Sequence, residues 1–277
     1  MKKSSYLVAG FAVVVLIGAA GYLWRQQQAP GPAPSALPPI AAWSPPASVP
    51  TASAASEPAI KHPIEARADN QQLAAPLDAE GALTELFGRK TVLSVFQTQD
   101  FARRFVATID NLGRTHASVA MWPVNPTAGR LVVEKKNGAE VIGADNGLRY
   151  TAFVLLVEAV DLRKAVATYG RLYPQLQQAY EDLGFPKRYF NDRLVEVIDL
   201  LLATPDLDQP LKVRLPQING PLQPERPWVL YEFDEPALQS LAAGQKILLR
   251  LGPVNERRLK GKLIEIRRLV TAVTLPR

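Results

Sequence analysis

The sequence predicts a mainly helical (α+β) domain, preceded by a single transmembrane helix and a Pro/Ala-rich linker. Three observations carry this prediction. The first is an apolar run without a charged side chain, Tyr6–Trp24. The second is a tract of Pro, Ala and Ser that follows it, and the third is the helical spacing of apolar residues in the rest of the chain. We therefore divide the chain into residues 1–25 (short cytoplasmic N-terminus and anchor), 26–66 (disordered linker) and 67–277 (helical periplasmic domain).

The apolar run Tyr6–Trp24 has the length of a membrane anchor. At ~1.5 Å rise per residue, a helix of this length nearly spans a hydrocarbon core of ~30 Å. Lys2 and Lys3 precede the run, and after Arg25 no charged residue follows until Glu57. The positive-inside rule therefore predicts a cytoplasmic N-terminus, with everything after Arg25 on the far side of the membrane. The lipid bilayer is thus the first predicted partner.

A cleaved signal peptide is the alternative to a permanent anchor. Gly18 and Ala20 satisfy the small-residue rule of a cleavage site. However, the apolar run continues through Leu23 and Trp24, beyond the ~7–15 residues of a signal-peptide core, which favours the uncleaved anchor. The chain contains no Cys, which excludes lipidation at Cys, thiol nucleophiles and thiolate metal sites. With only two His residues, a His-rich metal site is excluded too, and we expect no cofactor.

The linker is rich in proline, which fixes φ and favours an extended, semi-rigid chain. Its apolar content is mostly Ala, which is too little to pack a core. One interpretation is a spacer that holds the domain away from the bilayer, and the other is an ordinary disordered connection.

Apolar periodicity and capping residues define the expected elements of the domain. Helices are expected at Asp78–Phe87, Thr98–Gly113, from Gly147 to Val160, Leu162–Leu183, Asn191–Ala203, Glu235–Leu251 and Pro253–Val270. Thr98 and Asp161 are the expected N-caps, and Pro174 predicts a kink or a break. Asn137-Gly138 predicts a type I′ hairpin, and 211–215 and 229–233 are expected as short strands. The absence of an alternating βαβ series excludes a parallel nucleotide-binding sheet.

Three carboxylates lie at helical spacing in the expected helix Asn191–Ala203. Asp192, Glu196 and Asp199 fall on one face, opposite the apolar stripe. Two carboxylates with different environments can perform the acid/base chemistry of glycoside hydrolysis. Carboxylates at this spacing more commonly form ion pairs with Lys and Arg, so ion pairing, ligand binding and catalysis all stay open. No Gly-rich phosphate loop and no Gly-x-Ser-x-Gly or His-Glu-x-x-His motif is present.

The C-terminal segment carries the complementary charge. From Gly244 to Arg277 there are nine Lys and Arg residues against two acidic ones. In the helix expected at Pro253–Val270 they surround an apolar stripe, so the basic face binds either an anionic polymer or the domain's own acidic residues. No nucleic-acid-reading motif is present, and no nucleic-acid partner is predicted.

The candidate binding residues combine these two helices, and no catalytic or metal-ligating residue is predicted. They are Tyr189, Asn191, Asp192, Arg193, Glu196, Asp199, Arg257, Arg258, Lys260 and Lys262. The aromatic residues from Tyr150 to Phe190 can stack on sugars, but at helical spacing they are more typical of a core.

Three stretches resemble a known family. They begin at Phe105 (FVATIDNL), at Gln178 (QAYEDLGFP, continued by YFNDRLVEVID from Tyr189) and at Ala243 (AGQKILLRLGP). In this order they resemble the bacterial domain-of-unknown-function family 3014, over roughly Asp78 to Val270. The resemblance implies a membrane-anchored bacterial envelope protein, and it implies no activity. We therefore expect a non-enzymatic module that binds an envelope protein or cell-wall polymer, with a carboxylate-dependent glycan hydrolase as the alternative.

Overall fold

The computed structural model describes residues 59–64, 78–216 and 227–272. The predicted anchor Tyr6–Trp24 and most of the predicted linker lie outside the described residues, and so these predictions stay predictions. Within the described ranges, no helix combines the length and the apolar character that a membrane span requires.

The described fold is mainly helical with two short antiparallel hairpins, as predicted. The helices are α2 (Ala79–Phe87), α3 (Arg89–Val95), α4 (Phe101–Leu112), α5 (Leu148–Glu158), α6 (Leu162–Asp182), α7 (Phe190–Leu202), α8 (Pro236–Gln239), α9 (Ala243–Arg250) and α10 (Pro253–Thr271). Short 3-10 turns lie at Val119–Met121, Ala144–Gly147 and Pro227–Val229. The strands are β1 (Val133–Lys136), β2 (Ala139–Ile142), β3 (Val213–Arg214) and β4 (Glu232–Phe233).

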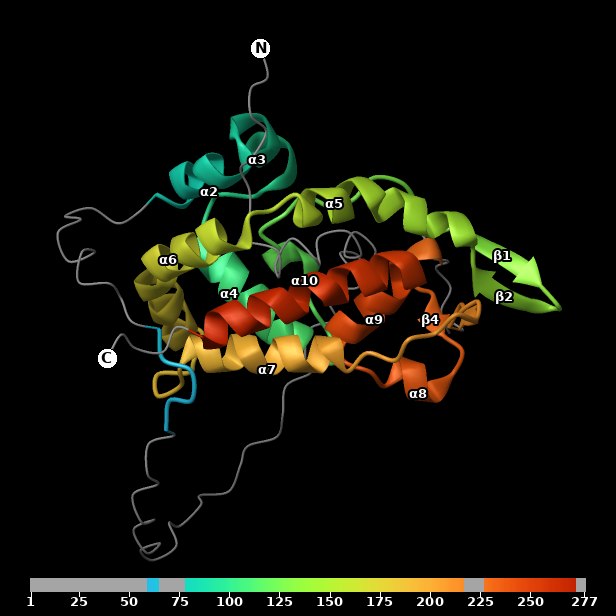
Figure 1. The fold of residues 1–277 in the computed structure, drawn as a ribbon. Coiled ribbons are helices and arrows are strands. Elements are labelled where there is room, and N and C mark those ends of the chain that lie inside the picture. Colours follow the sequence, from blue (N-terminus) through green and yellow to red (C-terminus); the bar gives the residue numbers. More distant parts are fainter. Residues whose placement is uncertain (1–58, 65–77, 217–226, 273–277) are drawn as a thin grey trace, which may run out of the picture.

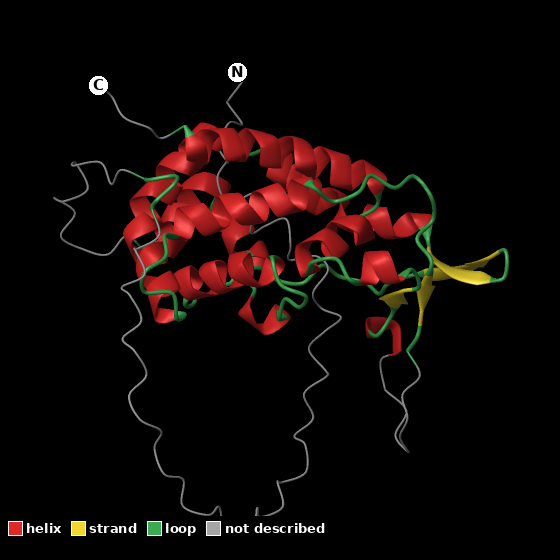
Figure 2. Cartoon of the chain, turned by 90° about the horizontal axis from the view of Figure 1, so that it is seen from below, coloured by secondary structure: helices red, strands yellow, loops and turns green. Residues whose placement is uncertain are grey.

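The core lies where α4 and α10 meet the other long helices. Helix α4 packs against α6, α7 and α9, while α10 packs against α5, α6 and α7 (Figure 1). The apolar stripe predicted for α4 is fully buried, and it includes Phe105, Ile109 and Leu112. Helix α6 packs mainly on α4 and α10 and only lightly on α7. Both hairpins lie at one end of this helical body (Figure 2).

Of the two expected N-caps, Asp161 is confirmed and Thr98 is not. Asp78 accepts hydrogen bonds from the first-turn amides of α2, and Asp161 does the same for α6. The Thr98 N-cap is wrong, because α4 begins after Asp100, which adopts a left-handed φ of 52°. The Thr98 hydroxyl instead donates to Glu80 at 3.1 Å. A contact between two segments thus replaces the local cap.

Helix α6 runs without interruption through Pro174, so of the two predicted alternatives, a kink or a break, the break is wrong. A proline inside a helix removes one hydrogen bond and costs about 3 kcal/mol. Buried side chains lie on both sides of it, with Tyr169 and Tyr173 before and Leu176 and Tyr180 after. Burying one such apolar side chain contributes about 1.5–3 kcal/mol, so packing outweighs the missing bond.

The first hairpin forms as predicted around Asn137-Gly138. Both turn residues have positive φ, 53° and 78°, as a type I′ turn requires. The segment that leads into β3 lies beside β2, and the Ile142 amide of β2 donates a hydrogen bond to the Leu211 carbonyl at 2.9 Å. Strands β3 and β4 pair as expected, but each is only two residues long.

One expected helix, Glu235–Leu251, is two helices in the structure. Helix α8 ends before Ser240, and α9 begins after Ala242, whose amide donates to the Gln245 side chain at 3.3 Å. The restart brings α9 very close to its neighbours. A Cβ on Gly244 would lie 2.5 Å from a methyl of Leu201 and 3.2 Å from the Leu112 carbonyl, so a side chain there would have to displace Leu201.

Candidate functional site

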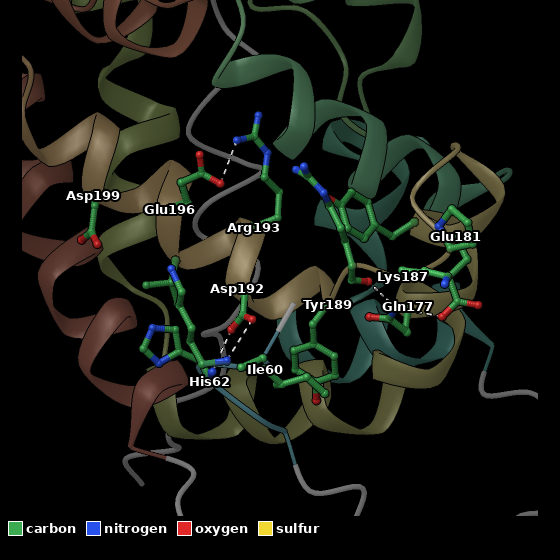
Figure 3. Close-up of a pocket in the computed structure, with 16 residues that line it drawn as sticks. Ile60, His62, Gln177, Glu181, Lys187, Tyr189, Asp192, Arg193, Glu196 and Asp199 are labelled. Atoms are coloured by element: carbon green, nitrogen blue, oxygen red, sulfur yellow. Dashed lines mark hydrogen bonds and ion pairs between the residues drawn. The ribbon is translucent and has the colours of Figure 1, made fainter. Parts of the chain in front are cut away.

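A hollow of about 760 Å³ is lined by the end of α6, the connection from α6 to α7, α7 as far as Asp199, and residues 59–62 (Figure 3). These segments lie at the end of the helical body opposite the hairpins (Figure 1). We call residues 59–64 the strap. The lining residues include Lys61, His62, Gln177, Glu181, Pro186, Lys187, Arg188, Tyr189, Asp192, Arg193, Glu196 and Asp199. Five of the predicted binding residues therefore line it: Tyr189, Asp192, Arg193, Glu196 and Asp199.

The strap is held through its backbone. The amides of Lys61 and His62 donate to the two oxygens of Asp192 at 3.0 and 2.7 Å. The Tyr189 hydroxyl accepts from the Ile64 amide at 2.6 Å and donates to the Ile64 carbonyl at 3.2 Å. Asn191 donates to the His62 carbonyl at 2.9 Å. Side chains at the start of α7 thus satisfy both backbone groups of two alternate strap residues.

Asn191 links the strap to the core. Its side chain is fully buried and also donates to the Val270 carbonyl at the end of α10, at 3.2 Å. It accepts from the Tyr169 hydroxyl at 3.1 Å, and its own amide donates to the Tyr173 hydroxyl at 3.1 Å. Burial raises the pKa of both tyrosine hydroxyls, so they remain protonated. Asn191 is therefore held in position by the core, with one side-chain donor directed at the strap.

The free energy that holds the strap is close to balanced. Its five hydrogen bonds contribute roughly 0.5–1.5 kcal/mol each. Burial of Ile64, which is 9% exposed, adds about 1.5–3 kcal/mol. Fixing the backbone of residues 61–64 costs about 1–2 kcal/mol per residue. The two ranges overlap, so the favourable contacts of the strap are similar in size to its ordering cost.

The three predicted carboxylates each have partners of their own. Asp192 binds the strap amides, and Glu196 pairs with Arg193 at 3.0 Å. Asp199 receives two hydrogen bonds from Arg267 of α10, one of them 3.0 Å long from Nη2. Ion pairing thus accounts for two of them, as the sequence favoured, while Asp192 has a positioning role that the sequence did not indicate.

Arg193 is anchored behind the hollow by a buried carboxylate. Its Nε donates to Asp110 of α4 at 3.0 Å, and its Nη2 donates to the Asp110 carbonyl at 3.0 Å. The Asp110 side chain is only 4% exposed, and it also accepts from Arg114 at 2.8 Å. The pKa of Arg193 is raised, because the carboxylates of Glu196 and Asp110 outweigh the opposing effect of its burial.

The basic residues predicted on α10 lie away from the hollow and are paired within the domain. Arg257 pairs with Asp208 at 3.1 Å, and Arg258 forms a two-pronged contact with Glu158. Lys260 donates to Asp206 at 2.8 Å and to the Thr204 carbonyl at 2.6 Å, and it pairs with Glu256 at 2.8 Å. Lys262 lies 3.7 Å from Glu265. The structure therefore does not join the two predicted sets of residues into one surface.

Sequence reasoning missed the strap and Asp110. The strap belongs to the predicted linker, but Ile60, Lys61, His62 and Ile64 depart from its Pro/Ala composition, and that was the available signal. Asp110 falls inside an apolar helix stripe, where a charge is unusual without a buried partner. The predicted aromatic core is correct, since Tyr150, Tyr169, Tyr173, Tyr180 and Phe190 are all buried.

The fold and the hollow together define a class of protein: a helical domain with a charged surface hollow bounded by an N-terminal strap. The chain belongs to a family of proteins of unknown function (DUF3014), whose family model matches residues 101–267. This result confirms the resemblance drawn from the three sequence stretches. No curated protein and no solved structure matches the chain. The matched range contains the α7 wall of the hollow, and the strap precedes it.

Proposed function

We propose that this chain is a single-pass inner-membrane protein whose periplasmic helical domain binds an envelope partner, a protein or a cell-wall polymer, without catalysing a reaction. The observation that carries the proposal is the strap. Residues that follow the predicted anchor and linker in the sequence form one wall of the hollow, which supports a binding site next to the segment that would lead to the membrane. The hollow also presents charged groups of both signs, as specific polar recognition requires.

The hydrolase alternative has less support. A glycosidase needs one carboxyl group that can protonate the leaving group and a second that attacks or activates water. In this hollow Asp192 is held by two strap amides, and Asp199 is held by both donors of Arg267. Glu196 is paired with Arg193. Hydrolysis would need two of these carboxylates free at the same time, whereas each of the three has a partner within the domain.

The predicted topology is testable because the chain has no native Cys. We expect a single Cys placed by Ser56→Cys to react with a membrane-impermeant maleimide in cells whose outer membrane is permeabilised. A Cys placed by Ser4→Cys is expected to react only after lysis, because the positive-inside rule keeps that end in the cytoplasm. Labelling of both sites, or of neither, in unlysed cells would contradict the topology.

Site-specific crosslinking tests the binding function itself. A photo-reactive amino acid at Pro186, on the rim of the hollow, is expected to give a discrete crosslinked adduct in the membrane fraction. The matched control position is Leu93 on α3, which is 64% exposed and does not line the hollow. Equal crosslinking at both positions, or no adduct at Pro186, would count against a binding role for the hollow.

A further inference from the structure

We propose that the start of α7 is a receptor for an extended polypeptide backbone. The strap is the occupant of this receptor that the chain itself supplies. An extended segment of a protein partner exchanges with the strap. This inference rests on the proposed binding function and names the chemistry of the partner. The three receptor side chains are Tyr189, Asn191 and Asp192, which lie together at the end of the hollow.

The receptor binds the main chain of its occupant rather than its side chains. The hydrogen bonds between these side chains and the strap go to backbone N–H or C=O groups of Lys61, His62 and Ile64. Both backbone groups of His62 and both of Ile64 are satisfied, with one residue skipped between them. The alternation of His62 and Ile64 resembles that of a strand added to a sheet edge, although the chain bends at Lys61 and His62 so that both of their amides reach Asp192. The receptor side chains thus bind the main chain of the occupant without pairing it to a strand.

The strap sequence fits this mode of recognition. The skipped residue is Pro63, which has no N–H to leave unsatisfied and favours an extended conformation in the residue before it. Only Ile64 is buried, while Lys61 and Pro63 are exposed and His62 is half-buried. The site therefore favours an extended segment with one apolar residue at the position of Ile64. The other side chains of the segment contribute little to its specificity.

Exchange is favoured by the position of the strap. It forms one wall of the hollow, so most of its own surface faces either the open space or solvent. Because the hydrogen bonds of the strap and its ordering cost are similar in size, the free-energy difference between the docked and the undocked strap is small. A glycan lacks the alternating N–H and C=O groups that the receptor side chains match, so the observations favour a polypeptide over a cell-wall polymer.

A peptide-binding experiment tests this inference without knowledge of the partner. The probe is a fluorescein-labelled, end-blocked hexapeptide with the strap sequence AIKHPI, titrated against the full-length chain in lipid nanodiscs. In the Ile64→Pro variant the internal strap loses its anchor and the amide that donates to Tyr189. We expect the apparent dissociation constant to fall on the order of tenfold relative to the unaltered chain, because the internal competitor is removed.

Two controls make the result specific. Adding Asp192→Ala to the Ile64→Pro variant is expected to abolish binding, because the acceptor for two strap amides is lost. A peptide N-methylated at the His and the final Ile keeps its side chains but loses two backbone donors, and it is expected not to bind. Circular dichroism checks that each variant is folded. If Ile64→Pro unfolds, replacing residues 59–64 with Gly and Ser weakens the hold on the strap without altering α7, because it removes the buried Ile64 side chain and raises the cost of ordering the backbone.

Three outcomes would overturn the inference. They are no peptide binding by a folded, opened chain, equal binding of the N-methylated peptide, and displacement of the probe by peptide-free cell-wall glycan chains. The last outcome would assign the receptor to a polymer instead. None of these results depends on the crosslinking experiment, so a missing cellular partner and a failed receptor are distinguishable.

Discussion

The Asp110→Ala variant is expected to lose about 3–5 kcal/mol of unfolding free energy, because the substitution removes the buried partner of a cation. Asp110 is 4% exposed and joins α4 to α7 through Arg193, whose side chain is 17% exposed. Without the carboxylate, the Arg193 guanidinium remains behind the hollow with only Glu196 as an ionic partner. Urea unfolding of the full-length chain in detergent micelles, followed by circular dichroism, measures the loss.

The same arginine supplies the matched control. Glu196 also pairs with Arg193 at 3.0 Å, but its side chain is 68% exposed. Exposed ion pairs contribute about 0–1 kcal/mol, so Glu196→Ala should change the unfolding free energy by no more than this. Asp110→Asn, which keeps an acceptor of the same shape, should fall between the two. Equal losses for Asp110→Ala and Glu196→Ala would show that the buried contact does not organise the α4–α7 packing.

The long helices were predictable because their burial is periodic. The stripes of α4, α7 and α10 place apolar residues at three- and four-residue intervals, and Asp78 and Asp161 add local capping signals. The errors arose where contacts between distant segments decide the local structure. Thr98 gives up its capping role for Glu80, and packing carries α6 through Pro174. No periodicity within α8 and α9 reveals that Gly244 must approach Leu112 closely.

The candidate site was predictable only as one face of one helix. Helical spacing places Asp192, Glu196 and Asp199 together, and all three line the hollow. Their partners were not predictable, because Asp192 binds an amide 130 residues away and Asp199 binds Arg267, 68 residues away. A sequence pattern describes a helix face but not the segment that covers it. The same holds for α10, whose basic face was predictable but whose partners were not. Its cations pair with acidic residues from α5 and from the chain that follows α7.

Lys260 was a candidate ligand-binding residue. Its contacts in the structure instead predict a large loss of unfolding free energy when it is replaced. Its side chain is 11% exposed and holds Glu256, which is 2% exposed. Burial raises the pKa of the Glu256 carboxyl, and the hydrogen bond and charge of Lys260 act against that rise. In the Lys260→Met variant the buried carboxylate loses its cation, so we expect about 3–5 kcal/mol less unfolding free energy at neutral pH. Urea unfolding at a series of pH values measures this deficit.

The pH dependence of this deficit identifies its cause. A carboxyl group whose pKa is raised in the folded state holds its proton more tightly there than in the unfolded chain. Its contribution is therefore fully present below the unfolded pKa of about 4.3 and is lost as pH rises through the folded value. Removing Lys260 raises that folded value further, so the deficit of the variant relative to the unaltered chain should shrink as pH falls from 7 toward 4.

A double variant separates an unpaired charge from a loss of packing. Glu256→Leu combined with Lys260→Met removes both charges, and it should recover most of the stability at neutral pH, because replacing a buried ion pair by apolar residues is often neutral. Lys262→Met is the control, since Lys262 lies 3.7 Å from the half-exposed Glu265 and should matter by less than about 1 kcal/mol. If the double variant is as unstable as Lys260→Met at every pH, the aliphatic stem of Lys260, rather than its charge, stabilises this part of α10.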